Sequence, residues 1–96
     1  MTLIKRSFSL SGHRTSVALE PVFWAELDRL AADRGEPLAR LVGAVDAART
    51  PDGGGLASAL RVTVLDALRR DRDRALSAAD AGAGGAPGGP PSIRWR

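Results

Sequence analysis

The chain of 96 residues contains no cysteine or tyrosine, and only one histidine. Without cysteine there is no disulfide, no thiol nucleophile and no cysteine-ligated zinc. The single histidine, His13, has no second histidine with which to share a metal ion, and no Ser–Asp arrangement that would make it a catalytic base. We therefore expect a protein that is not an enzyme and that holds no metal or cofactor.

Long apolar runs and nucleotide-binding loops are missing as well. No apolar run approaches the roughly 20 residues of a membrane span, and the first residues lack the apolar core of a signal peptide. The glycines at 53–55 lack the lysine and the Ser or Thr of a P-loop, and no GxGxxG motif follows a predicted strand. These absences favour a cytoplasmic protein with no membrane partner.

Acidic residues do not occur before Glu20, whereas Lys5, Arg6 and Arg14 do. Positive charge concentrated near the N-terminus is expected of a surface that faces nucleic acid. The alternative is an ordinary basic segment that its charges keep in solution. Because the net charge is only +3, charge alone leaves both interpretations open.

The period of the hydropathy pattern changes at about residue 20, from that of a strand to that of a helix. Over 13–19, Thr15, Val17 and Leu19 alternate with three other residues, Arg14, Ser16 and Ala18. A period of two predicts a half-buried strand, and such a strand needs a partner for its backbone groups. A second copy of the chain would supply one. Residues 3–10 also alternate, and they form either a first strand joined through a Ser11-Gly12 hairpin or a mobile arm.

Three helices are predicted after the strand. The first spans 21–34, with Pro21 at its first position, a buried stripe of Phe23, Leu27 and Leu30 flanked by Trp24 and Ala31, and Gly35 after its end. The second spans 37–49 and also begins with a proline, Pro37. A helical period rather than a period of two supports both predictions.

The third helix is predicted over 55–80. One apolar line contains Leu56, Leu60, Val64 and Leu68, and Val62 and Leu65 add a second apolar flank. So wide a stripe favours burial against both the chain itself and a partner. Charges then alternate in sign, with Asp66–Arg70 and Arg69–Asp73 at i, i+4, which indicates a solvated face. The Gly/Ala/Pro-rich tail at 81–96 ends in Arg94-Trp95-Arg96, which either stacks on a base, binds a protein or has no function.

The order of strand, proline-started helix, glycine turn and second helix resembles that of the ribbon-helix-helix DNA-binding proteins, the superfamily of the Arc and MetJ repressors. A closer resemblance is to a bacterial subfamily of short ribbon-helix-helix proteins. It is carried by the string HRTSVALE at 13–20, by Phe23-Trp24 and by Ala59-Leu60-Arg61-Val62, and it covers about residues 5–69.

The resemblance implies a mainly α fold with a short N-terminal β-strand. Two chains would form an intertwined homodimer through an intermolecular antiparallel ribbon, with an extra C-terminal helix. The chain then divides into an N-terminal arm or extra strand at 1–11, a ribbon-helix-helix core at 12–50, the third helix at 55–80 and a disordered tail at 81–96. The ribbon would enter the major groove of duplex DNA, and the dimer would act on the nucleoid as a transcriptional regulator, for which repressor and activator both stay open.

Specific residues follow from this resemblance. Base contacts are expected from Arg14, Ser16 and Ala18, which can pair with guanine, donate or accept a hydrogen bond, and touch a thymine methyl. Phosphate contacts are expected from Lys5, Arg6, His13, Leu38, Ala39 and Arg40. The dimer core is expected to contain Val17, Leu19, Phe23, Trp24, Leu27, Leu41, Val42 and Val45.

The start of the second helix departs from the family pattern, which often has Ser or Thr where this chain has Glu36-Pro37. The proline removes an amide and the glutamate adds a repelling charge, which Arg40 offsets in part. We therefore expect weak DNA binding, or dimers that bind side by side. The rival interpretation is a protein–protein adaptor or antitoxin-like module that binds a second protein through helix 56–76 or the tail.

Overall fold

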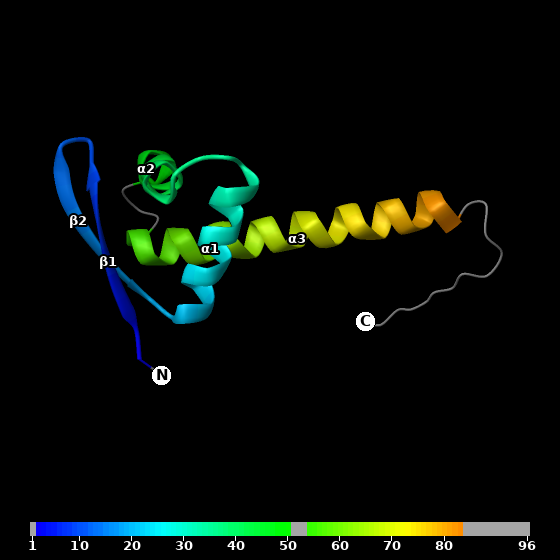
Figure 1. The fold of residues 1–96 in the computed structure, drawn as a ribbon, viewed down its shortest axis with the longest axis horizontal. Helices are drawn as coiled ribbons and strands as arrows, with labels where there is room; N and C mark the ends of the chain where they lie inside the picture. The colour runs from blue at the N-terminus through cyan, green and yellow to red at the C-terminus, as the bar shows by residue number, and fades with distance from the viewer. Residues whose placement is uncertain (1, 51–53, 84–96) are drawn as a thin grey trace.

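A computed structural model of the chain describes residues 2–50 and 54–83. In chain order the elements are β1 (Ile4–Leu10), β2 (His13–Leu19), α1 (Pro21–Asp33), α2 (Leu38–Ala48) and α3 (Leu56–Ala83). The two strands lie at one end of the molecule, and α1 and α2 lie beside the first part of α3, whose remainder extends away from the body (Figure 1). None of the described helices is long and apolar enough to cross a membrane.

The two strands form an antiparallel hairpin whose register runs from Ile4 opposite Leu19 to Leu10 opposite His13. Ser11 and Gly12 connect them with φ angles of 51° and 81°. Positive φ at both central residues is the requirement of a type I′ turn, whose twist matches that of the strands. Residues 4–10 are therefore a strand rather than a mobile arm. β2 pairs with β1 of its own chain along one edge, and the expected pairing of β2 with a second copy stays a prediction.

Glycine and proline set the helix boundaries. Gly35 has a φ of 66° and donates its N–H to the carbonyl of Ala32, while Glu36 donates to that of Ala31, both over 3.0 Å. These two bonds form a Schellman motif, which ends α1 one residue before the predicted position. Pro37 is the N-cap of α2 and not its first helical residue, so the prediction that it opens the helix was wrong.

Every element contributes to one hydrophobic core. Its buried members are Leu10, Val17, Leu19, Trp24, Leu27, Ala31, Leu41, Val42, Leu56, Leu60 and Val64. On α1 the buried residues are Trp24, Leu27 and Ala31, whereas Phe23 and Leu30 of the predicted stripe are only partly buried. The helix is thus rotated relative to the prediction, because Trp24 contacts Ile4, Phe8 and Arg6 of β1.

The core has a direct bearing on the expected dimer. Of the eight residues assigned to a dimer core, all except Phe23 and Val45 are buried within a single chain, and these two are partly buried. The buried residues of this set share one core with α3, which contributes Leu56, Leu60 and Val64 of its predicted apolar line. Leu68, the fourth residue of that line, is 41% exposed. Six of the eight residues thus lie in the core of one chain together with α3, and their part in a dimer stays a prediction.

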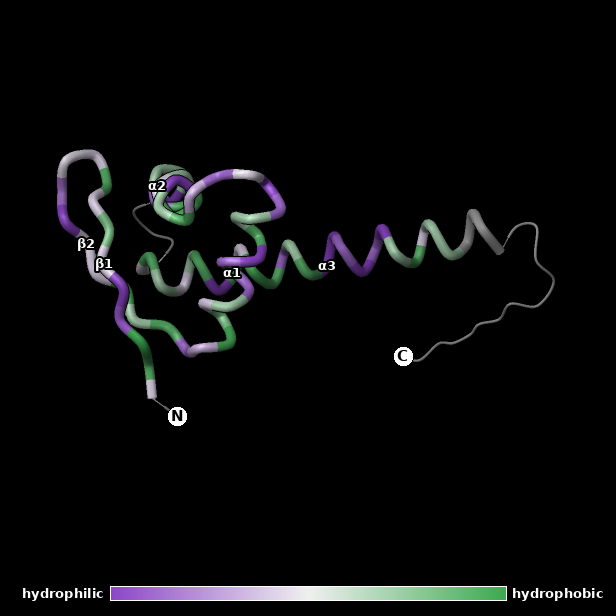
Figure 2. The backbone as a smooth tube through the Cα atoms, viewed as in Figure 1, coloured by the Kyte–Doolittle hydropathy of each residue, from purple (hydrophilic) through white to green (hydrophobic). Residues whose placement is uncertain are grey.

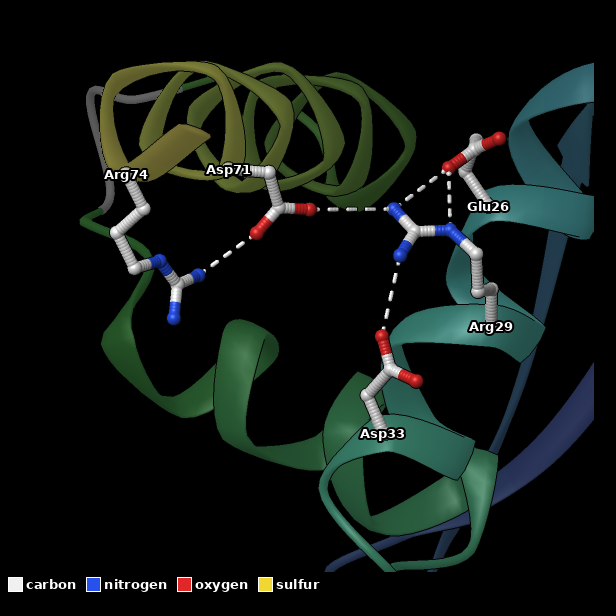
Figure 3. A network of polar contacts seen from close by, with 5 residues as sticks. All are labelled: Glu26, Arg29, Asp33, Asp71 and Arg74. Carbon is white, nitrogen blue, oxygen red and sulfur yellow. Dashed lines mark hydrogen bonds and ion pairs between the residues drawn. The ribbon is translucent and has the colours of Figure 1, made fainter. Parts of the chain in front are cut away.

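Beyond the core α3 becomes polar, and the tube in Figure 2 turns hydrophilic there. Asp71 accepts from Arg74 over 2.7 Å and lies 3.6 Å from Arg29 of α1, which also pairs with Glu26 and Asp33 (Figure 3). The pKa of the Arg29 guanidinium is raised, first by its hydrogen bond to Glu26. The pairs that the sequence analysis expected, Asp66–Arg70 and Arg69–Asp73, are not among those of the described residues. The predicted disordered tail lies outside the described residues except for 81–83, which continue α3.

Leu60 and Leu65 provide a matched test of this core, because both lie on α3 but are 0% and 46% exposed. We expect Leu60→Ala to lower the free energy of unfolding by about 2–5 kcal/mol, since it leaves a cavity in the hydrophobic core. Leu65→Ala should change it by less than about 1 kcal/mol. Urea denaturation followed by circular dichroism measures both, and equal losses would show that α3 does not cover the core.

Candidate nucleic-acid interface

The hairpin has one face turned away from the helices. On β2 this face carries Arg14, Ser16 and Ala18, the three residues expected to contact bases, and all are exposed except the partly buried Ala18. The register places exposed β1 residues directly beside them. The pairs are Ser9 beside Arg14, Ser7 beside Ser16, and Lys5 beside Ala18. We call these six residues the outer face.

The chemistry of the outer face is cationic and hydrogen-bonding. Neither strand contains an acidic residue, and within the described part of the chain Lys5 and Arg14 take part in no ion pair. The hydroxyls of Ser7 and Ser16 lie 3.0 Å apart and share a hydrogen bond. The face therefore offers two free cations and a pair of linked hydroxyls to an anionic partner that presents acceptors.

The opposite face of the hairpin is fixed by Trp24 of α1. Its indole N–H donates to the carbonyl of Ile4 over 2.7 Å, and its ring lies 6.0 Å from that of Phe8. The guanidinium of Arg6 lies 4.7 Å from the Trp24 ring centre and donates to both carboxylate oxygens of Asp28 over 3.0 and 3.2 Å. Arg6 thus lies on the helix side, so the structure does not place it with the phosphate-contacting residues where the sequence analysis put it.

The other residues expected to contact phosphate fall into separate places. His13 is exposed, but it begins β2 on the side of Val17 and Leu19, away from the outer face. Arg40 is exposed in the first turn of α2, where Leu38 and Ala39 also lie. Of the expected set, only Lys5 shares the outer face with the base-contacting residues.

The start of α2 is more open to an anion than its sequence indicates. Because Pro37 is the N-cap, its missing N–H does not remove a donor from the first turn. No side chain caps the backbone amides in the first turn of α2. The Glu36 carboxylate lies 3.9 Å from the guanidinium of Arg34, whose positive charge offsets the negative charge of Glu36. The prediction that Pro37 removes a backbone amide from the first turn of this helix was therefore wrong.

The free edge of β2 follows from the hairpin register. Leu10 and His13 flank the two-residue turn, so they form its hydrogen-bonded pair, and such pairs alternate along an antiparallel ladder. The backbone groups of Arg14, Ser16 and Ala18 consequently point away from β1. The described sheet has two strands, so no strand lies along this edge. The residues that offer their side chains to the outer face also offer their backbone to a further strand.

Two serines of the outer face were missed in the sequence analysis. Ser7 and Ser9 alternate with Phe8 and Leu10, and this signal was visible in the sequence. What the sequence could not supply was the pairing of β1 with β2, which brings the two rows together.

A second missed contact joins the end of the hairpin to α3. Glu20, between β2 and α1, accepts hydrogen bonds from Arg61 over 2.9 and 3.0 Å, and the Arg61 guanidinium also lies 5.7 Å from the Phe23 ring centre. The pKa of Glu20 is lowered from 4.5, first by hydrogen bonding to its own backbone and then by Arg61. This ion pair orients the hairpin relative to the helix that covers the core.

The Glu20 pair predicts a loss of stability in acid. Because the folded-state pKa lies below the value of 4.5, the contribution of Glu20 is present above that pH and is lost as the pH falls through the folded pKa. We expect Glu20→Gln to unfold more easily at neutral pH and to lose less stability between pH 6 and 3 than the unmodified chain. Arg61→Gln should act in the same direction. Thermal melts between pH 6 and 3 measure these losses. If the stability of Glu20→Gln depends on pH as that of the unmodified chain does, the contribution assigned to Glu20 is contradicted.

The comparisons with known proteins agree with this geometry. A family model described as a ribbon-helix-helix domain matches residues 3–68, from the start of the hairpin into α3. No curated protein and no solved structure matches the chain significantly. Domains of this family generally bind DNA as dimers and regulate transcription. Since the match covers more than half of the sequence, the chain belongs to the ribbon-helix-helix domain family.

Proposed function

We propose that the protein is a homodimer that binds duplex DNA at specific sequences, inserts its strands into the major groove and regulates transcription. The observation that carries this proposal is the outer face, where Arg14 and Ser16 are exposed beside an unpaired strand edge. Family membership makes DNA the partner to expect. Such a role involves no catalytic step, and it would place the protein on the nucleoid.

The dimer forms in this proposal by pairing the free edges of two β2 strands. Ser16 would lie opposite Ser16 of the second copy, and Arg14 opposite its Ala18, because these residues direct their backbone groups to that edge. An unpaired strand edge presents a row of backbone donors and acceptors that another strand can pair with, which favours such a dimer. Because the core is already buried within one chain, we infer that the two copies meet edge to edge, in place of the intertwined dimer that the resemblance implied.

The outer face of this dimer presents the chemistry that the major groove requires. Arg14 can donate two hydrogen bonds to the O6 and N7 atoms of guanine, Ser16 can donate or accept, and Ala18 can contact a thymine methyl. The amides of Leu38 and Ala39, together with Arg40, would hold a phosphate at the start of α2, since helix N-termini favour anions. Adjacent dimers on DNA would add affinity where one site is weak.

Arg14 provides the first test. On a duplex chosen by random-sequence selection, we expect Arg14→Ala to weaken binding by about 1–3 kcal/mol and to relax the preference at one base position. Arg70→Ala, which removes an exposed arginine of α3, should bind like the unmodified protein. Titrations at several salt concentrations measure the affinity. If the preference survives in Arg14→Ala, Arg14 does not read bases.

A second candidate function is favoured by one observation on α3. Val62, Leu65, Leu68 and Leu76 are 41–59% exposed, and exposed arginines at positions 69 and 72 lie among them. An amphipathic helix flanked by acidic residues would complement this surface, as the adaptor interpretation requires. The Arg94-Trp95-Arg96 tail of that interpretation lies outside the described residues.

The two functions separate in one experiment. The double variant Leu65→Gln/Leu76→Gln should fold and bind DNA normally, because both side chains are exposed. An amphipathic peptide with glutamates beside its apolar stripe should bind the unmodified protein and Leu3→Gln, a control on an exposed leucine outside α3, but should lose most of its affinity for the double variant. Equal binding of the peptide to all three proteins would exclude this surface.

A further inference from the structure

The outer face contains a row of side chains for which the function proposed above has little use. Lys5, Ser7 and Ser9 project from β1 beside the row expected to read bases. They are exposed, and the hairpin turn fixes their register relative to Arg14 and Ser16. A polar row suits a solvated strand face, and its place beside Arg14 and Ser16 also turns it toward any nucleic acid that those two residues contact.

The dimer geometry decides what β1 would face on DNA. Pairing two β2 strands gives a sheet in which β1 of each copy lies outermost. Neighbouring strands are about 4.8 Å apart, so the two β1 strands would be about 14 Å from each other, whereas the major groove is about 12 Å wide. The two β2 strands fit within the groove. Each β1 strand therefore lies over one of its sugar–phosphate walls.

We propose, on the basis of that function, that β1 is a second DNA-contacting strand whose ligand is the phosphate backbone. Lys5 and Ser9, at opposite ends of the row, contact phosphates on the walls of the groove. Along one line across the dimer the order is Ser9, Arg14, then Ala18 and Lys5 of the second copy. Each wall thus receives one ammonium group and one hydroxyl, with the base-reading residues between the walls.

Ser7 has a different part, because its hydroxyl is already bonded to that of Ser16 over 3.0 Å. Each hydroxyl has one proton, so the direction of this bond decides whether Ser16 offers a donor or an acceptor to a base. Ser7 is a positioning residue: it acts on sequence preference through Ser16 without touching a base. In the dimer the four serines form the central line of the sheet.

The experiment compares binding to a selected duplex and to a random duplex in a salt series. Lys5→Gln should weaken binding to both duplexes by a similar factor and make the slope of log Kobs against log salt shallower by about 1.8 per dimer. Ser9→Ala should weaken both about tenfold with the slope unchanged. Ser7→Ala should change the preference at the central base pairs and leave binding to the random duplex unaltered. Ser77→Ala and Arg70→Gln, on α3, are the controls, and circular dichroism verifies folding.

The outcomes separate this inference from the function on which it rests. If the unmodified protein binds neither duplex, both are wrong. If Arg14→Ala loses its preference while Lys5→Gln and Ser9→Ala bind normally, the function stands and β1 does not contact phosphate. If Lys5→Gln or Ser9→Ala instead alters base preference, β1 lies against the groove floor and the proposal is overturned. An unchanged preference in Ser7→Ala removes the positioning role of Ser7.

Discussion

The hydrogen bond from the Trp24 indole to the Ile4 carbonyl is the contact on which the interface depends. A two-stranded hairpin is only marginally stable alone in water, and Trp24 attaches this one to α1. The buried ring also supports Arg6 and packs beside Phe8. One face of the hairpin is thereby fixed against the helices, which leaves the other face to present Arg14, Ser16 and their neighbours in a defined order.

The third helix changes what a partner chain has to provide. Leu56, Leu60 and Val64 cover the core within one chain, so no second copy is needed to bury the residues of that core. On the hairpin, the feature left open to a partner is the backbone edge of β2. Association through hydrogen bonds at a solvated edge is weaker than exchange of a core, which makes monomer and dimer closer in free energy. Binding to DNA would then also stabilise the dimer.

Most of the local structure could be predicted from the sequence, because the hydropathy period and the positions of glycine and proline are local properties. The change of period at Leu19 marked the end of β2, and Gly35 marked the end of α1. The rotation of α1 toward Trp24 could not be predicted, since it depends on contacts with residues far along the chain. The partner of β2 was also ambiguous: alternation shows that a strand needs a neighbour, but not whether β1 or another chain supplies it.

Contacts between residues far apart in the sequence also limited the prediction of the candidate nucleic-acid interface. The row of Arg14, Ser16 and Ala18 could be identified from alternation, whereas the diversion of Arg6 to Asp28 arises from tertiary contacts between β1 and α1. The two-residue turn at Ser11-Gly12 has a final consequence. In a sheet with a period of two, gaining or losing one residue at the turn would exchange the two faces of a strand. Substitutions along the outer face, by contrast, leave the core intact. Evolution can therefore retarget this hairpin by changing side chains one at a time, provided that its length is conserved.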